Sequence, residues 1–285
     1  MAGAEDALAG RIACVDLETT GGHAGRDRVM EAGIVLLDGG AIVEEWSTLV
    51  NPGVRIPHAI QQFTGITEAM VTEAPPFAKV ADDIAARTDG CLFVAHNARF
   101  DYGFLRSEFR RLGRRFRAPV LCTVRLSRAL TPDERGHNLD AVMARHGIGC
   151  EARHRALGDA RVLAEFIGVA RARWPREVLA PLVARLTGTA QLPPQLDPGI
   201  ADELPESPGV YLLYGEADAL LYVGKAGNLA MRVPAHFTGS RARLDRELAE
   251  RVRRIEWIET AGEFGALLTE ARLIKSRRPA LNRRS

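Results

Sequence analysis

Five residues of types that suit hydrolytic chemistry lie in three separate segments of the chain. They are, in chain order, Asp16, Glu18, Asp101, His154 and Asp159. Asp16 and Glu18 come at the end of an apolar run, and because residues i and i+2 of a strand point to one face, we expect them to share a side. Asp101 follows a second apolar run, so we expect it at a strand end as well. This order predicts four converging carboxylates with one histidine beside them.

Converging carboxylates indicate a site for hard divalent cations. Mg²⁺ and Mn²⁺ prefer carboxylate and water ligands. Two such ions, roughly 3.5–4 Å apart, suit phosphodiester hydrolysis because they stabilise both the attacking and the leaving oxygen. The residue types therefore predict a nuclease.

The three segments read Asp-x-Glu-Thr-Thr-Gly at 16–21, His-Asn-Ala-x-Phe-Asp at 96–101 and His-x-Ala-x-x-Asp at 154–159. With them, residues 11 to about 173 resemble the DnaQ-like 3′–5′ exonucleases of the DEDDh type, which include polymerase proofreading subunits. The resemblance implies an RNase H-like α/β fold in which a mixed sheet is covered by helices. It also implies a general base and four ligands of two Mg²⁺ or Mn²⁺ ions. The base would be His154, since a histidine ordinarily titrates near neutral pH, and the ligands would be Asp16, Glu18, Asp101 and Asp159.

Two threonines follow the first acidic pair. Thr19 and Thr20 can donate hydrogen bonds to a terminal nucleotide, but threonines after a strand also cap turns. We carry both as substrate-binding candidates.

A second group of candidate residues lies at the other end of the chain. Two short apolar segments, each with a tyrosine (Tyr211 and Tyr222), flank a polar turn at 215–218, and a glycine turn then leads into a helix. Lys225 is expected at the start of that helix, where a phosphate is readily bound.

The two segments read Gly-Val-Tyr and Tyr-Val-Gly, and residues 208–285 resemble the GIY-YIG nuclease domain, most closely that of UvrC and Cho repair endonucleases. The resemblance implies a small α/β domain with Arg232 as the catalytic arginine, Glu270 as the ligand of one metal ion and Asn282 as a late site residue. His236 stands where many members have tyrosine and some have histidine. We carry Lys225, His236 and Asn282 as substrate-binding candidates.

These residue types suit the same reaction. An arginine fork binds phosphate oxygens in bidentate fashion, and Glu270 can hold a divalent ion that acts as a Lewis acid. A tyrosine near a cation can act as the base. The sequence leaves open whether this is Tyr211 or Tyr222, and we favour Tyr211.

Charge and composition set further bounds. The 285 residues carry a net charge of +2, but residues 207–285 hold 14 Lys and Arg against 9 Asp and Glu, which favours a nucleic-acid contact there. The four cysteines are far apart and include no Cys-x-x-Cys pair, which suits free thiols in a reducing cytoplasm. No apolar stretch reaches the roughly 20 residues of a membrane span. We expect a cytoplasmic protein without membrane contact.

The apolar patterns predict two domains joined by a linker. Strands are expected at 11–17, 29–37, 41–50, 91–95 and 120–122, and helices at 76–87, 99–113, 138–146 and 157–173. Seven prolines fall between positions 175 and 208, which excludes a long helix across that stretch, although 176–187 can form a short one. We therefore expect an exonuclease domain at 1–174, a proline-rich linker at 175–206 and a GIY-YIG domain at 207–285.

The combined interpretation is a metal-dependent DNA nuclease with 3′–5′ exonuclease and endonuclease activities that acts in repair. Single-stranded or nicked duplex DNA is the expected substrate, and repair or replication proteins are the expected partners. Three alternatives stay open: an epsilon-like proofreading subunit of DNA polymerase III, an RNA-trimming exonuclease, and a DNA-binding adaptor with an inactive GIY-YIG domain.

Overall fold

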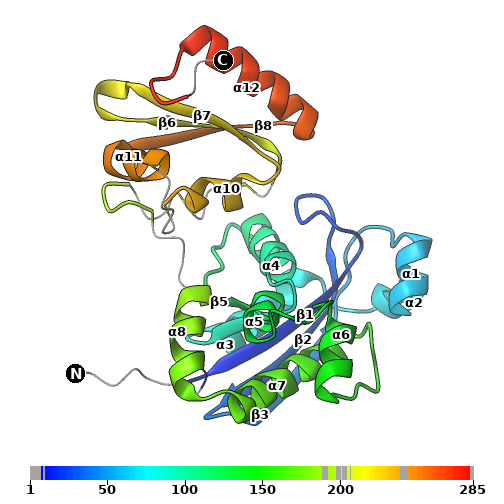
Figure 1. Cartoon of the computed structure of the whole chain (residues 1–285). Coiled ribbons are helices and arrows are strands. Elements are labelled where there is room, and N and C mark those ends of the chain that lie inside the picture. The colour runs from blue at the N-terminus through cyan, green and yellow to red at the C-terminus, as the bar shows by residue number, and fades with distance from the viewer. Residues whose placement is uncertain are drawn as a thin grey trace. The chain divides into compact units, whose positions relative to one another are not determined.

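The structure is a computed structural model that forms two compact units, Met1–Gly188 and Thr189–Ser285. It describes residues 8, 10–187, 192–196, 200, 204–205, 207–237 and 243–282. Figure 1 labels the elements along the chain.

The first unit is built on a five-stranded mixed sheet. Its strands stand in the order β3-β2-β1-β4-β5. β1 pairs antiparallel with β2, and β2 pairs antiparallel with β3. On the other side, β4 pairs parallel with β1, and β5 pairs parallel with β4. The strands are β1 (Ile12–Thr19), β2 (Val29–Asp38), β3 (Ala41–Leu49), β4 (Leu92–Ala95) and β5 (Val120–Cys122).

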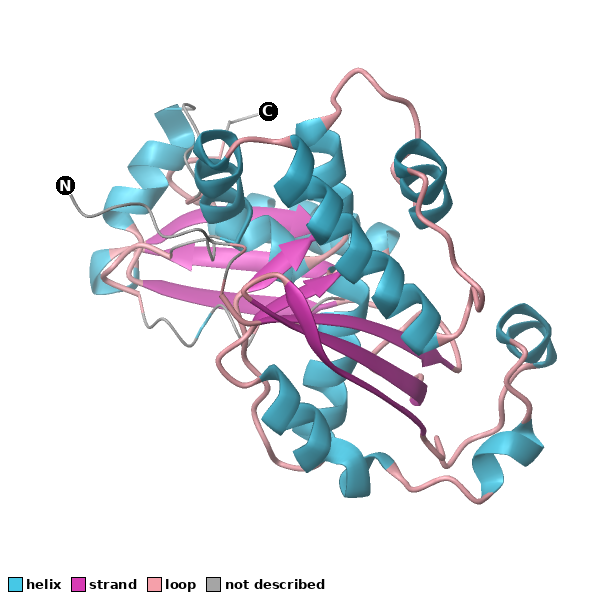
Figure 2. Ribbon diagram, turned by 90° about the horizontal axis from the view of Figure 1, so that it is seen from below, coloured by secondary structure: helices cyan, strands magenta, loops and turns pink. Residues whose placement is uncertain are grey.

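Helices cover both faces of this sheet (Figure 2). One buried cluster joins the sheet to α5, α6, α7 and α8, and a second joins it to α3 and α4. The helices are α1 (His58–Thr64), α2 (Glu68–Thr72), α3 (Phe77–Thr88), α4 (Arg99–Arg111), α5 (Thr123–Leu130), α6 (Leu139–His146), α7 (Ala156–Arg173) and α8 (Arg176–Thr187).

The alternation of side chains along β1 explains how one strand serves both faces. Ile12 and Cys14 pack in the cluster that contains α7, whereas Ala13, Val15 and Leu17 pack in the cluster that contains α3 and α4. Because side chains alternate along a strand, Asp16 and Glu18 belong to the α7 face. The carboxyl end of β1 therefore turns from apolar to acidic on the side that α7 covers.

The second unit holds a three-stranded antiparallel sheet in the order β7-β6-β8. One core cluster packs this sheet against α10 and α11, and another packs it against α12. The elements are β6 (Gly209–Tyr214), the 3₁₀ helix η1 (Glu216–Asp218), β7 (Leu220–Ala226), α10 (Leu229–Ala235), α11 (Arg243–Arg251), β8 (Arg254–Glu259) and α12 (Glu263–Arg277).

The predicted strands and the four predicted helices of the first unit are present, each within about two residues of its expected ends. The sequence reading missed α1, α2 and α5, which are short and follow loops without a long apolar period. Among the described helices, none combines the length and the apolar character that a membrane span needs.

Parts of the stretch expected to be a linker pack into the cores of the two units. Helix α8 buries Leu179, Val183 and Leu186 in the core of the first unit, and its internal proline is tolerated there. Leu196 and Leu204 pack into the core of the second unit. Positions 188–191, 197–199, 201–203 and 206 lie outside the described residues. Both ends of this stretch therefore contribute to the cores of the two units, and the domain bounds stay a prediction.

Candidate active sites

The acidic pair of β1 lies at the carboxyl end of the central strand. Asp16 and Glu18 are both half-buried and stand opposite Gly33 and Glu31 of β2. Apolar residues fill the same face further back along the strand. The strand thus delivers two carboxylates to one place with a rigid backbone behind them.

Asp159 reaches this pair from α7. It lies in the first turn of the helix and is buried. One carboxylate oxygen from each of Asp16, Glu18 and Asp159 lies within 4.8 Å of the others, a spacing that suits shared ligation of a metal ion. A Cβ on Gly33 would overlap the backbone of Ala156, so this glycine permits the close approach of the start of α7.

Asp101 joins the group from α4. The side chain is 3% exposed, and its Oδ1 accepts a hydrogen bond of 3.1 Å from the backbone N–H of Leu17. That N–H lies between the two acidic residues of β1. The expectation that Asp101 sits at a strand end is wrong in detail: the residue lies in the first turn of α4, after β4 has ended. The first turn of α4 brings the carboxylate of Asp101 to the backbone N–H of Leu17.

Burial and neighbouring negative charges raise the pKa of Asp16, Glu18 and Asp101. Burial raises the pKa of Asp16 well above its usual range, and the charges of Asp101 and Asp159 add to this. Burial, followed by the charge of Asp159, raises the pKa of Glu18 to about 8. Burial likewise raises the pKa of Asp101 to about 8. The cluster resists carrying its full negative charge without a cation, and its all-oxygen donor set fits Mg²⁺ or Mn²⁺.

Two arginines that the sequence reading did not single out flank His154. The Arg153 guanidinium donates to Asp159 and also to Asp140, so it neutralises part of the cluster. Arg155 pairs in bidentate fashion with Glu31, which is 3% exposed. Glu31 also accepts the N–H of Ala156 at 3.0 Å and so fixes the start of α7. The sequence held one signal of this ion pair: Glu31 lies inside an apolar strand sequence, and a buried charge requires a partner.

His154 lies just before α7 with a left-handed backbone, φ 59°. Its ring packs against Phe63 of α1, with the ring centroids 4.2 Å apart. Asn97, just before α4, has the same kind of backbone, φ 61°. Asparagine and histidine adopt a positive φ more readily than most other non-glycine residues, so these residue types fit the two turns that lead to the site aspartates.

The two threonines after β1 are engaged with the chain itself. Thr19 and Thr20 are 7% and 4% exposed. The hydroxyl of Thr19 donates to Gly21 O, and that of Thr20 accepts from the N–H of Arg28 at 3.0 Å. This arrangement favours the turn-capping alternative, and their contact with a substrate stays a prediction.

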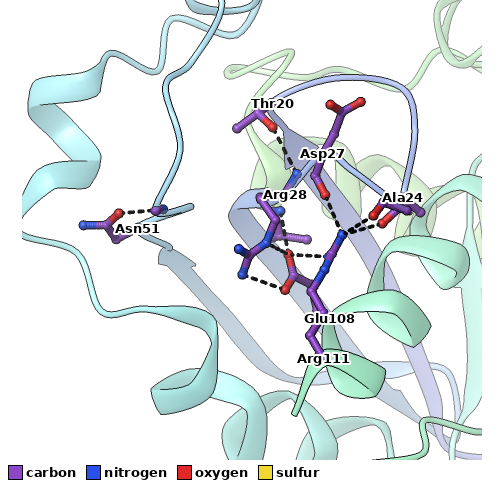
Figure 3. Close-up of polar contacts among 10 residues, drawn as sticks. Thr20, Ala24, Asp27, Arg28, Asn51, Glu108 and Arg111 are labelled. Carbon is purple, nitrogen blue, oxygen red and sulfur yellow. Dashed lines mark hydrogen bonds and ion pairs between the residues drawn. The ribbon is translucent and has the colours of Figure 1, made fainter. Parts of the chain in front are cut away.

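The loop that these threonines begin is fastened to α4 through a buried glutamate (Figure 3). Glu108 is 1% exposed and accepts from Arg28 Nε at 2.8 Å and Nη2 at 3.0 Å. Arg111 pairs with the same carboxylate and donates to Ala24 O at 2.9 Å. Helix α4 thus holds both Asp101 and the loop after β1, so one rigid element positions a site carboxylate and the wall beside it.

Divalent cations are expected to stabilise the protein more at about pH 8 than at about pH 5. Without a cation, the folded protein keeps protons on Glu18 and Asp101 up to about pH 8, whereas the unfolded chain releases them near pH 4. The stability of the cation-free protein therefore falls as pH rises through this window, and a bound cation removes the loss. With the ion at about 100 times its Kd the gain is roughly 2.7 kcal/mol, several degrees in Tm.

Calorimetry with EDTA or with Mg²⁺ at the two pH values measures this difference. Asp16→Asn should remove most of the cation-dependent shift in Tm. A shift of equal size at both pH values would contradict the proposed cause.

The second candidate site gathers around the two tyrosines of the small sheet. The hydroxyl of Tyr211, a residue with no exposed surface, lies 2.6 Å from Nε2 of His236. Tyr222 is half-buried, and its ring centroid lies 6.1 Å from that of Tyr211. A Cβ on Gly224 would overlap both rings, so this glycine leaves the room in which the tyrosines meet.

Electrostatics differ for the two tyrosines. Burial, followed by the neighbouring Tyr222, raises the pKa of Tyr211. Burial also raises the pKa of Tyr222, and the Arg232 guanidinium offsets part of that rise. Arg232 is exposed on α10, and Glu270 of α12 adds its negative charge to the surroundings of both tyrosines.

The remaining candidates of this unit have contacts that the sequence did not indicate. Glu270 accepts the N–H of Lys225 at 2.9 Å, so α12 is joined to β7 at the site. Lys225 itself lies in β7, and the expectation that it begins a helix is wrong. The side chain of Asn282 accepts from Val223 N and donates to Val223 O, as a neighbouring strand would. This contact supports a positioning role, and its binding to a substrate stays a prediction.

Comparison with known proteins follows the same division. Residues 13–167 match the model of the family described as Exonuclease, and residues 207–283 match that of the UvrC-like GIY-YIG domain. A bifunctional exonuclease/endonuclease protein of Mycobacterium tuberculosis, so named, is 37% identical over 95% of this chain. The chain spans 44% of the length of that relative.

Two further similarities are to a polymerase subunit and to a solved exonuclease. The DNA polymerase III subunit epsilon of Aquifex aeolicus is 33% identical over 60% of this chain and 85% of its own. The structure of E. coli Exonuclease I in complex with a dT13 oligonucleotide aligns with a TM-score of 0.56 and 16% identity, covering 72% of this chain and 48% of that one. The latter likeness concerns the fold and confirms the expected RNase H-like arrangement. The chain belongs to the exonuclease family, and a UvrC-like GIY-YIG domain follows its exonuclease domain.

Proposed function

We propose that this protein is a DNA nuclease with two hydrolytic sites, a 3′–5′ exonuclease site in the first unit and an endonuclease site in the second. The convergence of Asp16, Glu18 and Asp159, with Asp101 bonded to the strand between the first two, is the observation that carries the exonuclease assignment. Exonuclease I was solved with an oligonucleotide, which supports DNA as the substrate here.

In the exonuclease site the four carboxylates would hold two divalent cations, Mg²⁺ or Mn²⁺. When bound, these ions stabilise the negative charge that develops on the attacking and leaving oxygens. His154 takes the proton of the attacking water, and its ring is oriented by the contact with Phe63. Arg155 and Glu31 hold the turn on which His154 and Asp159 depend.

In the endonuclease site Glu270 would hold one divalent cation, which supplies Lewis-acid assistance when bound. Arg232, exposed beside the tyrosines, clamps the phosphate. We assign the base to Tyr222 rather than to Tyr211, because Tyr211 has no surface through which to reach a water molecule. This assignment reverses the preference drawn from the sequence.

Arg232→Ala should lower the rate of nicking by about 10²–10³-fold, the usual effect of removing one charge-stabilising donor. Digestion from 3′ ends should be unchanged, since Arg232 belongs to the other unit. Relaxation of closed circular DNA on gels measures the rate. Arg277→Ala removes another exposed positive charge of the same unit and should nick normally. Equal losses in both variants would show a general charge effect instead of a phosphate clamp.

Repair is the setting that we propose, because a nick with a 3′-OH end would provide a start for the exonuclease site. We place the protein in the cytoplasm, where the four free cysteines, all within the described residues, would stay reduced. Repair or replication proteins are the partners we expect.

The test is incubation of the pure protein, with Mg²⁺ or Mn²⁺, with end-labelled single-stranded DNA, nicked duplex, closed circular DNA and RNA. We expect mononucleotides from DNA 3′ ends and nicking of the circle. Exclusive digestion of RNA would replace the DNA assignment with RNA trimming, and release of only mismatched 3′ ends would favour proofreading. Binding to the circle without any cut would make the second unit an adaptor.

A further inference from the structure

An aspartate that no motif includes completes a chain of hydrogen bonds in the second unit. The Oδ1 of Asp245, on α11, lies 2.6 Å from Nδ1 of His236. Nε2 on the other side of the same ring lies 2.6 Å from the hydroxyl of Tyr211. The His236 side chain is 3% exposed and that of Asp245 19%. Three side chains from β6, the end of α10 and α11 therefore form one line of hydrogen bonds, buried at Tyr211 and His236.

The chemistry of the groups fixes the direction of these bonds. A carboxylate offers only acceptors, so Nδ1 of His236 must donate to Asp245. Burial lowers the pKa of His236, which favours the neutral ring. In the neutral ring Nε2 is then an acceptor, and the hydroxyl of Tyr211 donates to it. The oxygen of Tyr211 is left to accept a hydrogen bond on the side of Tyr222, whose ring centroid lies 6.1 Å from that of Tyr211.

We propose that Asp245 is a positioning residue of the endonuclease site, which holds His236 in the Nδ1–H form so that a proton can pass from Tyr222 through Tyr211 to Nε2. This inference rests on the proposed endonuclease function. Serine hydrolases use a carboxylate in the same way, to fix the tautomer of the histidine and to stabilise its charged form.

The proton transfer balances, and it places no negative charge on the buried Tyr211. As the water oxygen bonds to phosphorus, its proton moves to Tyr222, the proton of Tyr222 moves to Tyr211, and that of Tyr211 moves to Nε2. The bond from phosphorus to the leaving oxygen breaks, and that oxygen takes a proton from solvent. The buried Tyr211 gains and loses a proton together, so no phenolate forms where burial opposes one. The positive charge rests on His236 beside Asp245 and returns to solvent as a proton afterwards.

Asp245→Asn in the full chain tests the proposal. An amide can donate to Nδ1 and impose the other tautomer, so we expect kcat for nicking closed circular DNA to fall about 10²–10⁴-fold with little change in KM. Asp245→Glu, which keeps the carboxylate, should recover part of the rate. Glu250→Gln removes one negative charge from an exposed position of the same helix and should nick as the unaltered protein does.

Nitrogen-15 NMR of His236 provides a readout that is independent of activity. We expect the Nδ1–H tautomer in the unaltered protein and a shift toward Nε2–H in Asp245→Asn. An unaltered protein with the Nε2–H tautomer, or an Asp245→Asn variant that nicks at the full rate, would overturn the proposal. An unaltered protein that never nicks would refute the endonuclease function, and the tautomer would then still decide whether Asp245 orients His236.

Discussion

Asp16→Ala should abolish the release of mononucleotides from DNA 3′ ends, with a loss on the order of 10³-fold or more, because it removes a ligand of ions that contribute several kcal/mol to the transition state. Asp16 shares its cluster with Glu18 and Asp159 and stands on the central strand of the sheet. The altered protein should fold, because the substitution removes a buried carboxyl group whose ionisation is opposed by burial and by its neighbours.

Release of labelled nucleotides from single-stranded DNA measures the effect, with Asp38→Ala as the control. Asp38 is an exposed aspartate at the end of β2 that lies opposite the start of β1, away from the acidic end. Full activity of Asp16→Ala in a pure sample would refute the assignment of the site.

His154→Ala is expected to lower the rate of 3′-end digestion by about 10²–10⁴-fold, the usual contribution of a general base. The affinity for Mg²⁺ or Mn²⁺ should change little, because the described carboxylate oxygens form the metal cluster without the imidazole. The backbone of residue 154 has a positive φ, which glycine adopts more readily than alanine. His154→Gly therefore serves as a second variant, and we expect the same rate from it.

His58→Ala is the matched control, since His58 is an exposed histidine at the start of α1. Single-turnover rates and cation titrations separate the two roles of His154. A collapse of cation affinity with a proportional fall in rate would make His154 a ligand, and the base would have to be sought elsewhere.

The sequence predicted the elements that hold the exonuclease site because their signals are local. β1 reads as an apolar strand that ends in an acidic pair, and Asp101 and Asp159 each follow a recognisable motif. The helix that carries Asp101 was predicted at 99–113, but nothing local shows that its first turn places the carboxylate of Asp101 on the N–H of Leu17. Helix α8 was expected only as an option, because its proline weakens the helical pattern while burial in the core compensates.

The residues that the sequence did not reveal act through contacts between distant segments. Glu31 with Arg155 and Glu108 with Arg28 are charged pairs that look like solvated residues until the fold buries them. Asp245 likewise lies among exposed charges on α11, and only the fold brings it to His236. Tyr211 is fully buried and Tyr222 is half-buried. The two sequence motifs are too similar to predict this difference in burial.

The central claim, two separate hydrolytic sites in one chain, is tested most directly by one paired assay. The unaltered protein, Asp159→Ala and Glu270→Ala are each incubated with Mg²⁺ or Mn²⁺, closed circular DNA and 3′-labelled linear DNA. We expect Asp159→Ala to nick circles without digesting ends, and Glu270→Ala to digest ends without nicking. Loss of both activities in either variant, or an unaltered protein that leaves every circle intact, would contradict the claim.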